Sequence, residues 1–400
     1  MKNMMTATHL PILAVAATLG FSTANLLAQA ADEVPLPAVH DANISLKLEI
    51  QHAIDQGVKW FQSQQDPETG AWSDTDQPAL SALALSSMMG DPSRDPAGAL
   101  PAGAAKGYAY LASKTKDDGG IYGKGLACYN TSLSLMALLL NPDPALTTAK
   151  LDARRFLINQ QSDFDIKGET DSPYDGGVGY GGTYAHSDLS NTHFVLQALH
   201  YSRPLAAESG SATDKKMVLD WDAAITFVSR CQNLPETSGD WASDDEEVKG
   251  GFVYFPGNSK AGIKELPGGK VALRSYGSMS YAGLLSFIYA GLDKSDPRIE
   301  AVLTWLQNNY SLDENPGMGE EGLFYYYHTM AKALAVCEID ILELADGTKV
   351  DWRRDLSVRL LNQQSEDGSW ENTTGRWWEN DPTLVTAYAL LALEHIHRRL

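Results

Sequence analysis

The sequence is poor in basic residues and contains no basic stripe. Its 400 residues include 31 Lys and Arg against 51 Asp and Glu, which gives a formal net charge of −20. Proteins that bind nucleic acid neutralise phosphates with clustered Lys and Arg. We therefore expect no nucleic-acid partner, and the acidic surface is also repelled by anionic lipid headgroups.

Cysteine is scarce as well. The three cysteines, Cys128, Cys231 and Cys337, lie far apart in the chain, which excludes a disulfide framework and a CxxC metal site. We therefore predict no metal ion and no cofactor. Aromatic residues are not scarce: they make up 9% of the chain and include nine Trp. They supply enough apolar surface for a packed core, which excludes disorder for most of the chain.

Long hydrophobic runs are missing beyond the N-terminus. Lys2 precedes an apolar run over residues 10–21 and a small-residue site at residues 28–30. This pattern is typical of a signal peptide over residues 1–30, with a retained helix or anchor as the alternative. Residues 31–45 indicate an extended linker. No later run reaches about 18 apolar residues, so we expect an exported protein, periplasmic or extracellular, without stable membrane insertion.

The remaining chain, residues 46–400, is a series of six similar repeats of about 60 residues each. In each repeat an amphipathic stretch ends near Gln or Asn. A turn with Gly and an apolar, mostly aromatic residue follows, and a more apolar stretch comes next. The last copy is the clearest, with Gln364, Gly368 and Trp370 before its apolar run. The first copy places Trp72 at the corresponding position.

The two kinds of stretch predict two kinds of helix. In the first kind, Ile299, Val302, Leu303 and Leu306 follow the i, i+3, i+4, i+7 spacing of one apolar face. The second kind, such as residues 384–393, is apolar on nearly every face, which predicts burial on all sides. Half-exposed helices around an inner ring of buried ones satisfy both patterns. We therefore predict a single all-α domain in which six helical hairpins close into an α/α toroid.

The turns resemble the QW repeats of the squalene cyclase and protein prenyltransferase β-subunit superfamily. The best match is the segment QSEDGSW at residues 364–370, and the resemblance covers roughly residues 46–400. It implies the toroid. A Gln side chain can bond free backbone groups at helix ends, Gly permits the turn, and Trp fills the gap between repeats. We interpret these turn residues as structural.

Triterpene cyclases of this superfamily carry a D-x-D-D-T motif, and residues 188–192 resemble it imperfectly. Asp188 and Thr192 match, whereas Ser190 and Asn191 replace the second and third Asp. In the family the middle Asp protonates an alkene, which requires neighbours that stabilise its anion. Ser190 cannot supply that proton. The resemblance leaves Asp188 as a candidate acid, with a helix N-cap as its alternative role.

Prenyltransferases of the superfamily hold zinc with an Asp and a Cys that open one inner helix and a His that opens a later one. His328 resembles that His, but the earlier helix start, around Tyr276, has neither Asp nor Cys. A His without partners is a poor zinc site. We therefore predict no metal site, and His328 is either a candidate catalytic residue or a buried core histidine.

The starts of the inner helices and the loops before them are expected to meet at one mouth of the toroid. Carboxyl groups there face helix N-termini, whose partial positive charge is expected to lower the pKa of Asp188 and Asp381. Tyr325 and Glu379 belong to the same mouth segments. The candidate catalytic residues are Asp188, Asp381, His328 and Tyr276. The candidate substrate-binding residues are Asp76, His186, Asn191, Arg274, Tyr326, Trp377 and Trp378.

These observations favour an isoprenoid-handling enzyme, a cyclase-like isomerase or a prenyl transferase, with Asp188 or Asp381 as its acid. One alternative is a non-catalytic exported module that binds a lipid, glycan or partner protein in the central cavity. Another is a polysaccharide lyase on an α/α barrel, which would use Tyr, His and Arg. Because Ser190 replaces the acid of the motif, we expect a polar or amphipathic small-molecule ligand and no cyclisation of squalene.

Overall fold

The computed structural model of the protein describes residues 43–181 and 186–400, which belong to one compact unit, Ala42–Leu400. The predicted signal peptide, residues 1–30, and the linker as far as residue 42 lie outside the described residues. Helix α1 begins at Ile44, so the last two residues of the predicted linker are helical. Apart from 3-10 turns and two short hairpins, the regular structure of the described residues is α-helical. The prediction of an all-α fold is confirmed for them.

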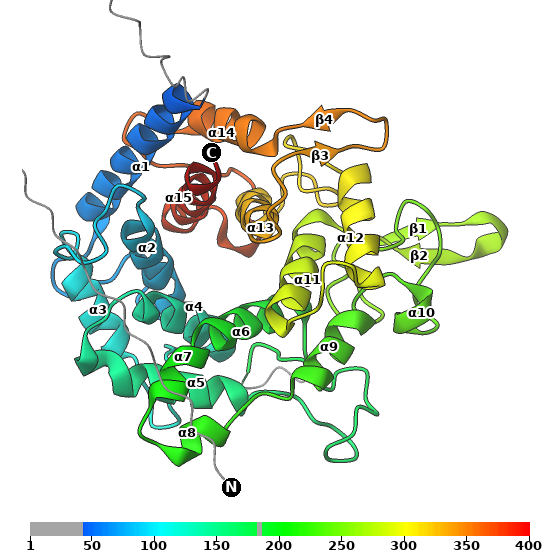
Figure 1. The fold of residues 1–400 in the computed structure, drawn as a ribbon, viewed down its shortest axis with the longest axis horizontal. Coiled ribbons are helices and arrows are strands. Elements are labelled where there is room, and N and C mark those ends of the chain that lie inside the picture. Colours follow the sequence, from blue (N-terminus) through cyan, green and yellow to red (C-terminus); the bar gives the residue numbers. More distant parts are fainter. Residues whose placement is uncertain (1–42, 182–185) are drawn as a thin grey trace, which may run out of the picture. The chain divides into compact units, whose positions relative to one another are not determined.

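Twelve helices of the described part alternate along the chain between an outer and an inner set (Figure 1). The outer helices keep one face in solvent, and they are α1(Ile44–Gln64), α3(Ala104–Ser113), α5(Thr147–Ile158), α9(Trp221–Arg230), α12(Pro297–Asn308) and α14(Trp352–Gln363). The inner helices are buried on nearly every face, and they are α2(Pro78–Gly90), α4(Ala127–Leu139), α6(Leu189–Tyr201), α11(Gly277–Ala290), α13(Leu323–Val336) and α15(Pro382–Arg399).

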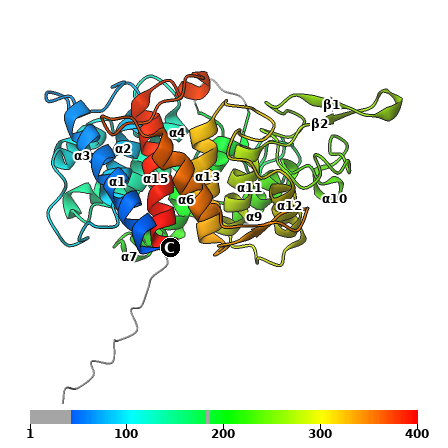
Figure 2. The same cartoon turned by 90° about the horizontal axis from the view of Figure 1, so that it is seen from above.

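Shorter elements fill the connections. The short helices are α7(Arg203–Glu208), α8(Ala212–Lys216) and α10(Pro235–Ser238), and the 3-10 turns are η1(Pro144–Leu146), η2(Pro267–Gly269) and η3(Arg376–Trp378). The antiparallel pairs are β1(Ile263–Glu265) with β2(Val271–Leu273) and β3(Leu342–Glu343) with β4(Lys349–Val350). The β1–β2 hairpin projects away from the helices (Figure 2). The repeat pattern does not predict these insertions.

The inner helices pack in sequence order. α2 packs on α4, α4 on α6, α6 on α11, α11 on α13, and α13 on α15, while α15 also packs on α2. These helices carry fully buried side chains such as Leu135, Leu285 and Leu390, which belong to one hydrophobic core. Burial of one such leucine contributes about 1.5–3 kcal/mol, so the apolar faces recognised in the sequence hold the inner helices together.

Glutamines in four of the repeats join their own turn to the next outer helix. Gln65 Nε2 donates to the carbonyl of Gly70 in its own turn at 2.8 Å and to the carbonyl of Gly103, the N-cap of α3, at 3.0 Å. Gln161, Gln232 and Gln364 make the same pair of bonds. One bond goes to a turn carbonyl, and the other goes to a carbonyl of the next outer helix or of its N-cap. These side chains satisfy backbone groups that would otherwise be unpaired, which is a structural role.

The turn glycines are required by both conformation and space. Gly368 has a φ of +95°, and a Cβ there would lie 2.6 Å from the carbonyl oxygen of Gln56 in α1. Gly70, Gly119, Gly176 and Gly250 also have a positive φ. At each of them a Cβ would lie similarly close to a carbonyl oxygen of the next outer helix. Only glycine fits such a position without a backbone shift. The adjacent Trp370 is fully buried and donates from Nε1 to the carbonyl of Leu360 at 2.8 Å.

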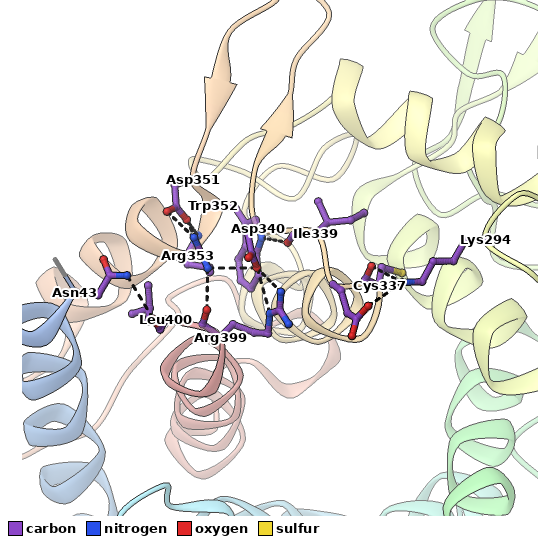
Figure 3. A network of polar contacts seen from close by, with 11 residues as sticks. Asn43, Lys294, Cys337, Ile339, Asp340, Asp351, Trp352, Arg353, Arg399 and Leu400 are labelled. Carbon is purple, nitrogen blue, oxygen red and sulfur yellow. Dashed lines mark hydrogen bonds and ion pairs between the residues drawn. The ribbon is translucent and has the colours of Figure 1, made fainter. Parts of the chain in front are cut away.

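A polar network joins α14 to the end of α15 (Figure 3). Arg353 donates from Nη1 to the carbonyl of Arg399 at 2.8 Å and from Nε to Asp351 at 2.8 Å. Arg399 in turn bonds Asp340 at 2.6 Å. The Arg353 side chain is only 12% exposed, so solvent screens these pairs less than it screens surface pairs. The network holds the last outer helix against the last inner one.

Candidate functional site

A cavity of about 310 Å³ lies at the N-terminal ends of the inner helices. Residues from the first two turns of α4, α6, α11, α13 and α15, or from their N-caps, supply most of its walls, and the connections that hold Tyr180, Tyr254 and residues 377–379 supply the rest. The lining residues are Leu126, Tyr129, Tyr180, Ser190, Phe194, Tyr254, Tyr276, Ser278, Met279, Gly322, Tyr325, Trp377, Trp378, Glu379 and Tyr388. Its volume is at the lower end of the range of ligand pockets, roughly 300–1,000 Å³, which favours a small ligand.

The wall of this cavity is aromatic. Nine of its fifteen lining residues are Tyr, Trp or Phe. Tyr129 and Tyr388 lie with their hydroxyl oxygens 3.3 Å apart, and Tyr254 donates to the hydroxyl of Tyr180 at 3.2 Å. Burial raises the pKa of Tyr129 to about 12 and the pKa of Tyr388 well above its usual value. The phenols are therefore neutral, and their faces can stabilise a cation.

Among the described residues that line the cavity, Glu379 is the only one with a carboxyl group. It is 1% exposed, and its two oxygens accept the backbone N–H groups of Phe324 at 3.2 Å and Tyr325 at 2.7 Å, at the start of α13. Asn372 Nδ2 donates a third hydrogen bond at 2.7 Å. Burial raises the pKa of Glu379 and is only partly offset by these donors. The group therefore retains a proton at a higher pH than an exposed Glu, and three donors stabilise its anion once the proton leaves.

The Trp377–Trp378 pair forms part of the rim. Both residues have a positive φ, 55° and 67°, and both remain about two-fifths exposed, 42% and 40%. The Arg376 guanidinium lies 4.4 Å from the centre of the Trp377 ring and pairs with Glu321. A non-glycine residue in this left-handed region costs on the order of 1–2 kcal/mol. The surrounding contacts hold two indoles beside the cavity despite that cost.

Asp188 is the N-cap of α6 and does not line the cavity. Its carboxylate accepts the backbone N–H and the side-chain Nδ2 of Asn191, both at 2.8 Å. The expectation that the helix N-terminus lowers the pKa of Asp188 is wrong, because burial dominates and raises the pKa to about 6. Thr192, the other match to the cyclase motif, bonds the backbone of Val178 through its hydroxyl. In this structure both matching residues have structural contacts.

Three of the predicted site residues, Tyr276, Trp377 and Trp378, line the cavity. Tyr326, Arg274 and Asp76 do not, and each is engaged elsewhere. The Tyr326 hydroxyl donates to the carbonyl of Ser311 at 2.8 Å. Arg274 donates from Nε to the carbonyl of Ile263 at 3.0 Å, and Asp76 pairs with Lys124.

The other predicted residues also lie outside the cavity wall. Asp381 caps α15 through the N–H of Thr383 at 2.8 Å and accepts a hydrogen bond from Ser73. The His186 ring lies 4.6 Å from that of Phe255. His328 is buried behind the wall and stacks on Tyr388, with 5.4 Å between ring centres.

The lining residues that were not predicted include Tyr129, Tyr180, Tyr254 and Tyr388. Their signal in the sequence is an aromatic residue in or just before the first two turns of an otherwise aliphatic inner helix, or in the turn before it. Among the described residues, no group of three or more His, Cys, Asp or Glu side chains could hold a metal ion. In the same part of the chain, no helix combines the length and apolar character that a membrane span requires.

Comparison with protein-family models gives no match, and no curated protein sequence matches the chain. The structure is similar to solved structures of the type II terpene cyclase MstE from Scytonema. A variant of that enzyme in complex with its product, merosterolic acid A, gives a TM-score of 0.53 at 11% identity, over 89% of this chain and 100% of that one. The apo enzyme gives 0.52 at 10% identity, over 88% and 99%.

A further MstE variant, in complex with its substrate geranylgeranyl dihydroxybenzoate, gives a TM-score of 0.51 at 11% identity over 89% of this chain and 100% of that one. At such low identity the likeness concerns the fold alone. The chain has a terpenoid cyclase-like fold.

Proposed function

We propose that the six hairpins form a closed α/α toroid and that the cavity at its mouth binds a small prenylated molecule as the substrate of a cyclisation. The observation that carries this proposal is the buried carboxyl group of Glu379, which lies among nine aromatic residues in the described part of the cavity wall. An apolar prenyl chain is desolvated by such a wall, and a carbocation formed on it is stabilised by the aromatic faces.

Glu379 acts as the acid in this proposal. Its proton moves to a carbon of an alkene, where a C–H bond forms and a tertiary carbocation remains. A second double bond of the same chain attacks the cation and closes a ring. A neighbouring carbon then loses a proton to water, which restores an alkene, and Glu379 regains a proton from water before the next turnover. The net reaction is an isomerisation, so it needs no further reactant.

The surroundings of Glu379 support this role in both protonation states. Burial favours the neutral carboxylic acid before the reaction. After the proton has left, the N–H groups of Phe324 and Tyr325 and the amide of Asn372 stabilise the carboxylate, together with the partial positive charge at the start of α13. Asp188 is also buried at the start of a helix, and both of its oxygens accept hydrogen bonds from Asn191, but it does not line the cavity.

The test is incubation of the purified protein with geranylgeranyl dihydroxybenzoate, geranylgeraniol and squalene, followed by product analysis. We expect a cyclic product from a prenylated substrate and none from squalene. Glu379→Gln should reduce the rate by at least about 100-fold, the usual contribution of a general acid, while quenching of aromatic fluorescence shows that the substrate still binds.

Asp188→Asn is the discriminating variant, because it removes the carboxyl group that resembles the cyclase motif. We expect it to retain activity. Loss of product in Asp188→Asn with full activity in Glu379→Gln would move the acid to Asp188. Binding of prenylated compounds without conversion by the wild type would instead identify a non-catalytic binding module.

Export of the protein belongs to the same proposal and rests on the pattern of residues 1–30. Sequencing of the N-terminus after expression in a secreting host tests it. We expect the mature chain to begin at Ala31, and an intact Met1 would contradict cleavage.

A further inference from the structure

A cluster of polar side chains lies behind the cavity wall, between α6, α13 and α15. On α13, Tyr325 lines the cavity, and His328 and Lys332 follow it at i+3 and i+7, on the same face of the helix. We name the set His193, Gln197, His328, Lys332 and His395 the lysine–histidine cluster. It adjoins the cavity because Tyr388 belongs to the cavity wall and stacks on His328.

The members of the lysine–histidine cluster lie close together. The rings of His328 and His395 have centres 6.2 Å apart. Lys332 is near enough to lower the pKa of each of the three histidines by charge repulsion. Three helices therefore bring four groups that can carry positive charge to one place.

Four of these side chains are more than nine-tenths buried, and two of them have a ring nitrogen without a hydrogen-bond partner in the described part of the chain. His193, Gln197, His328 and Lys332 are 1%, 5%, 6% and 7% exposed. Nδ1 of His193 and Nδ1 of His328 have no hydrogen-bond partner among the described residues. Lys332 Nζ and the Gln197 amide make no hydrogen bond within the same residues, and these atoms keep a small accessible surface through which a ligand can reach them. Buried polar groups in proteins are normally paired, so this set indicates a ligand.

The charge of the cluster indicates which ligand fits. Among the described residues no carboxyl group shifts the pKa of Lys332 or of the three histidines. Burial lowers the pKa of His193 and His395 to about 3 and that of His328 well below its usual value. The histidines are therefore neutral near pH 7, and Lys332 is the one group that carries charge. An unpaired buried ammonium is costly, and one negative charge balances it.

We propose that the lysine–histidine cluster binds a carboxylate, with Lys332 as its counter-ion and the imidazole N–H groups and the Gln197 amide as further donors. A carboxylate offers about four acceptor positions and one negative charge, which matches one ammonium and several neutral donors. A phosphate carries more charge than the cluster balances. The carboxylate comes either from a free small acid or from the end of an amphipathic compound. This site does not depend on proton transfer from Glu379.

The experiment measures the Tm of the full chain at pH 6.5 and constant ionic strength with sodium acetate, sodium phosphate, farnesoic acid or farnesol. A carboxylate at 100 times its Kd should raise the Tm by about 3 °C, whereas phosphate and farnesol should have a smaller effect. A rise in Tm with acetate shows that a free small acid is enough to occupy the site. A shift with farnesoic acid alone identifies the carboxyl end of an amphipathic compound.

The variant Lys332→Met should abolish the carboxylate-dependent shift. It should also raise the Tm without ligand, because it removes an unpaired buried ammonium. The matched control is Lys150→Met, since Lys150 is 6% exposed but donates to the carbonyl of Asn141 at 2.6 Å. This control, like Glu379→Gln, should keep the carboxylate shift. A shift that persists in Lys332→Met, a stronger shift with phosphate, or no shift with any carboxylate would overturn the proposal.

Discussion

Glu379 accepts a hydrogen bond from the backbone N–H of Tyr325 at 2.7 Å, and both side chains line the same cavity. The bond connects the loop before α15 to the first turn of α13. The proposed acid and an aromatic wall residue therefore keep a fixed relation to each other. A site that must direct a proton to one carbon of a flexible prenyl chain requires such fixed geometry.

The first prediction concerns the pH dependence of the proposed reaction. Burial raises the pKa of Glu379, and the protonated form is the active one. The rate of product formation should be constant at low pH and fall about tenfold per pH unit above that pKa. Rate measurements with a prenylated substrate from pH 4 to pH 9 test this. A rate that rises with pH would show that Glu379 acts as a base.

The second prediction concerns Asp188. Its folded pKa is raised to about 6, so between pH 4 and pH 6 the folded chain binds a proton that the unfolded chain releases. The free energy of unfolding therefore falls as pH rises through this window. Asp188→Asn removes the titrating carboxyl group and with it this fall in the free energy of unfolding, and it keeps a side chain that can cap α6. It should stabilise the protein at pH 7 by on the order of 1–3 kcal/mol.

Denaturant unfolding of the wild type and Asp188→Asn at pH 4, 5, 6 and 7 measures the effect. Asp188→Ala is the companion variant, because it removes both the charge and the cap, and it should be less stable than Asp188→Asn by about 1 kcal/mol. Parallel stability curves for the wild type and Asp188→Asn would contradict the raised pKa.

The third prediction uses two glycines with a similar backbone. Gly368 and Gly347 both have a positive φ, +95° and +82°, but only at Gly368 would a Cβ meet another atom, the carbonyl oxygen of Gln56 at 2.6 Å. Gly347→Ala should cost about 1–2 kcal/mol from the backbone conformation alone. Gly368→Ala should cost about 2 kcal/mol more, because α1 must shift. Equal losses in thermal or denaturant unfolding would show that the turn does not depend on this close approach.

The repeat pattern predicted the helices and the turns because each is set by local chemistry. Gln364 bonds a turn carbonyl, Gly368 adopts a positive φ, and Trp370 donates to a backbone carbonyl of the preceding outer helix. Each residue type fills such a role at a helix end, so these roles could be inferred from residue type and spacing. The all-α fold was predictable for the same reason. The insertions that contain α7, α8 and β1–β2 follow no period and carry no such signal.

The cavity was less predictable, because its lining depends on how each helix is rotated about its axis. Neighbouring residues in a helix differ by about 100° in direction, so Tyr325 reaches the cavity whereas Tyr326 bonds the carbonyl of Ser311. The sequence pattern predicted the burial of the inner helices but not the burial of the polar residues at their N-termini. A helix N-cap was expected to lower the pKa of Asp188, but desolvation in the packed interior exceeds that effect.

The fourth prediction concerns the cost of burying Lys332. Its folded pKa is lowered from 10.5 to about 7, so above pH 7 the folded chain has released a proton that the unfolded chain still binds. The free energy of unfolding therefore rises with pH, by at most about 1.4 kcal/mol per pH unit. Below pH 7 the full cost of the buried charge remains. The three histidines of the cluster titrate below this window, since burial lowers their pKa.

Comparison with Lys332→Met isolates this contribution from all other groups. Between pH 7 and pH 9.5 the wild type should gain on the order of 3 kcal/mol relative to the variant, as measured by denaturant unfolding in carboxylate-free buffer. Arg398 is a further cation near the cluster, and its charge lowers the pKa of His395. Both proteins keep Arg398, so its contribution cancels in the comparison. In saturating acetate the gain should shrink, because a bound carboxylate favours the protonated ammonium and raises the pKa of Lys332 again. A gain that is the same with and without acetate would separate the titration of Lys332 from anion binding and leave the cluster without its proposed ligand.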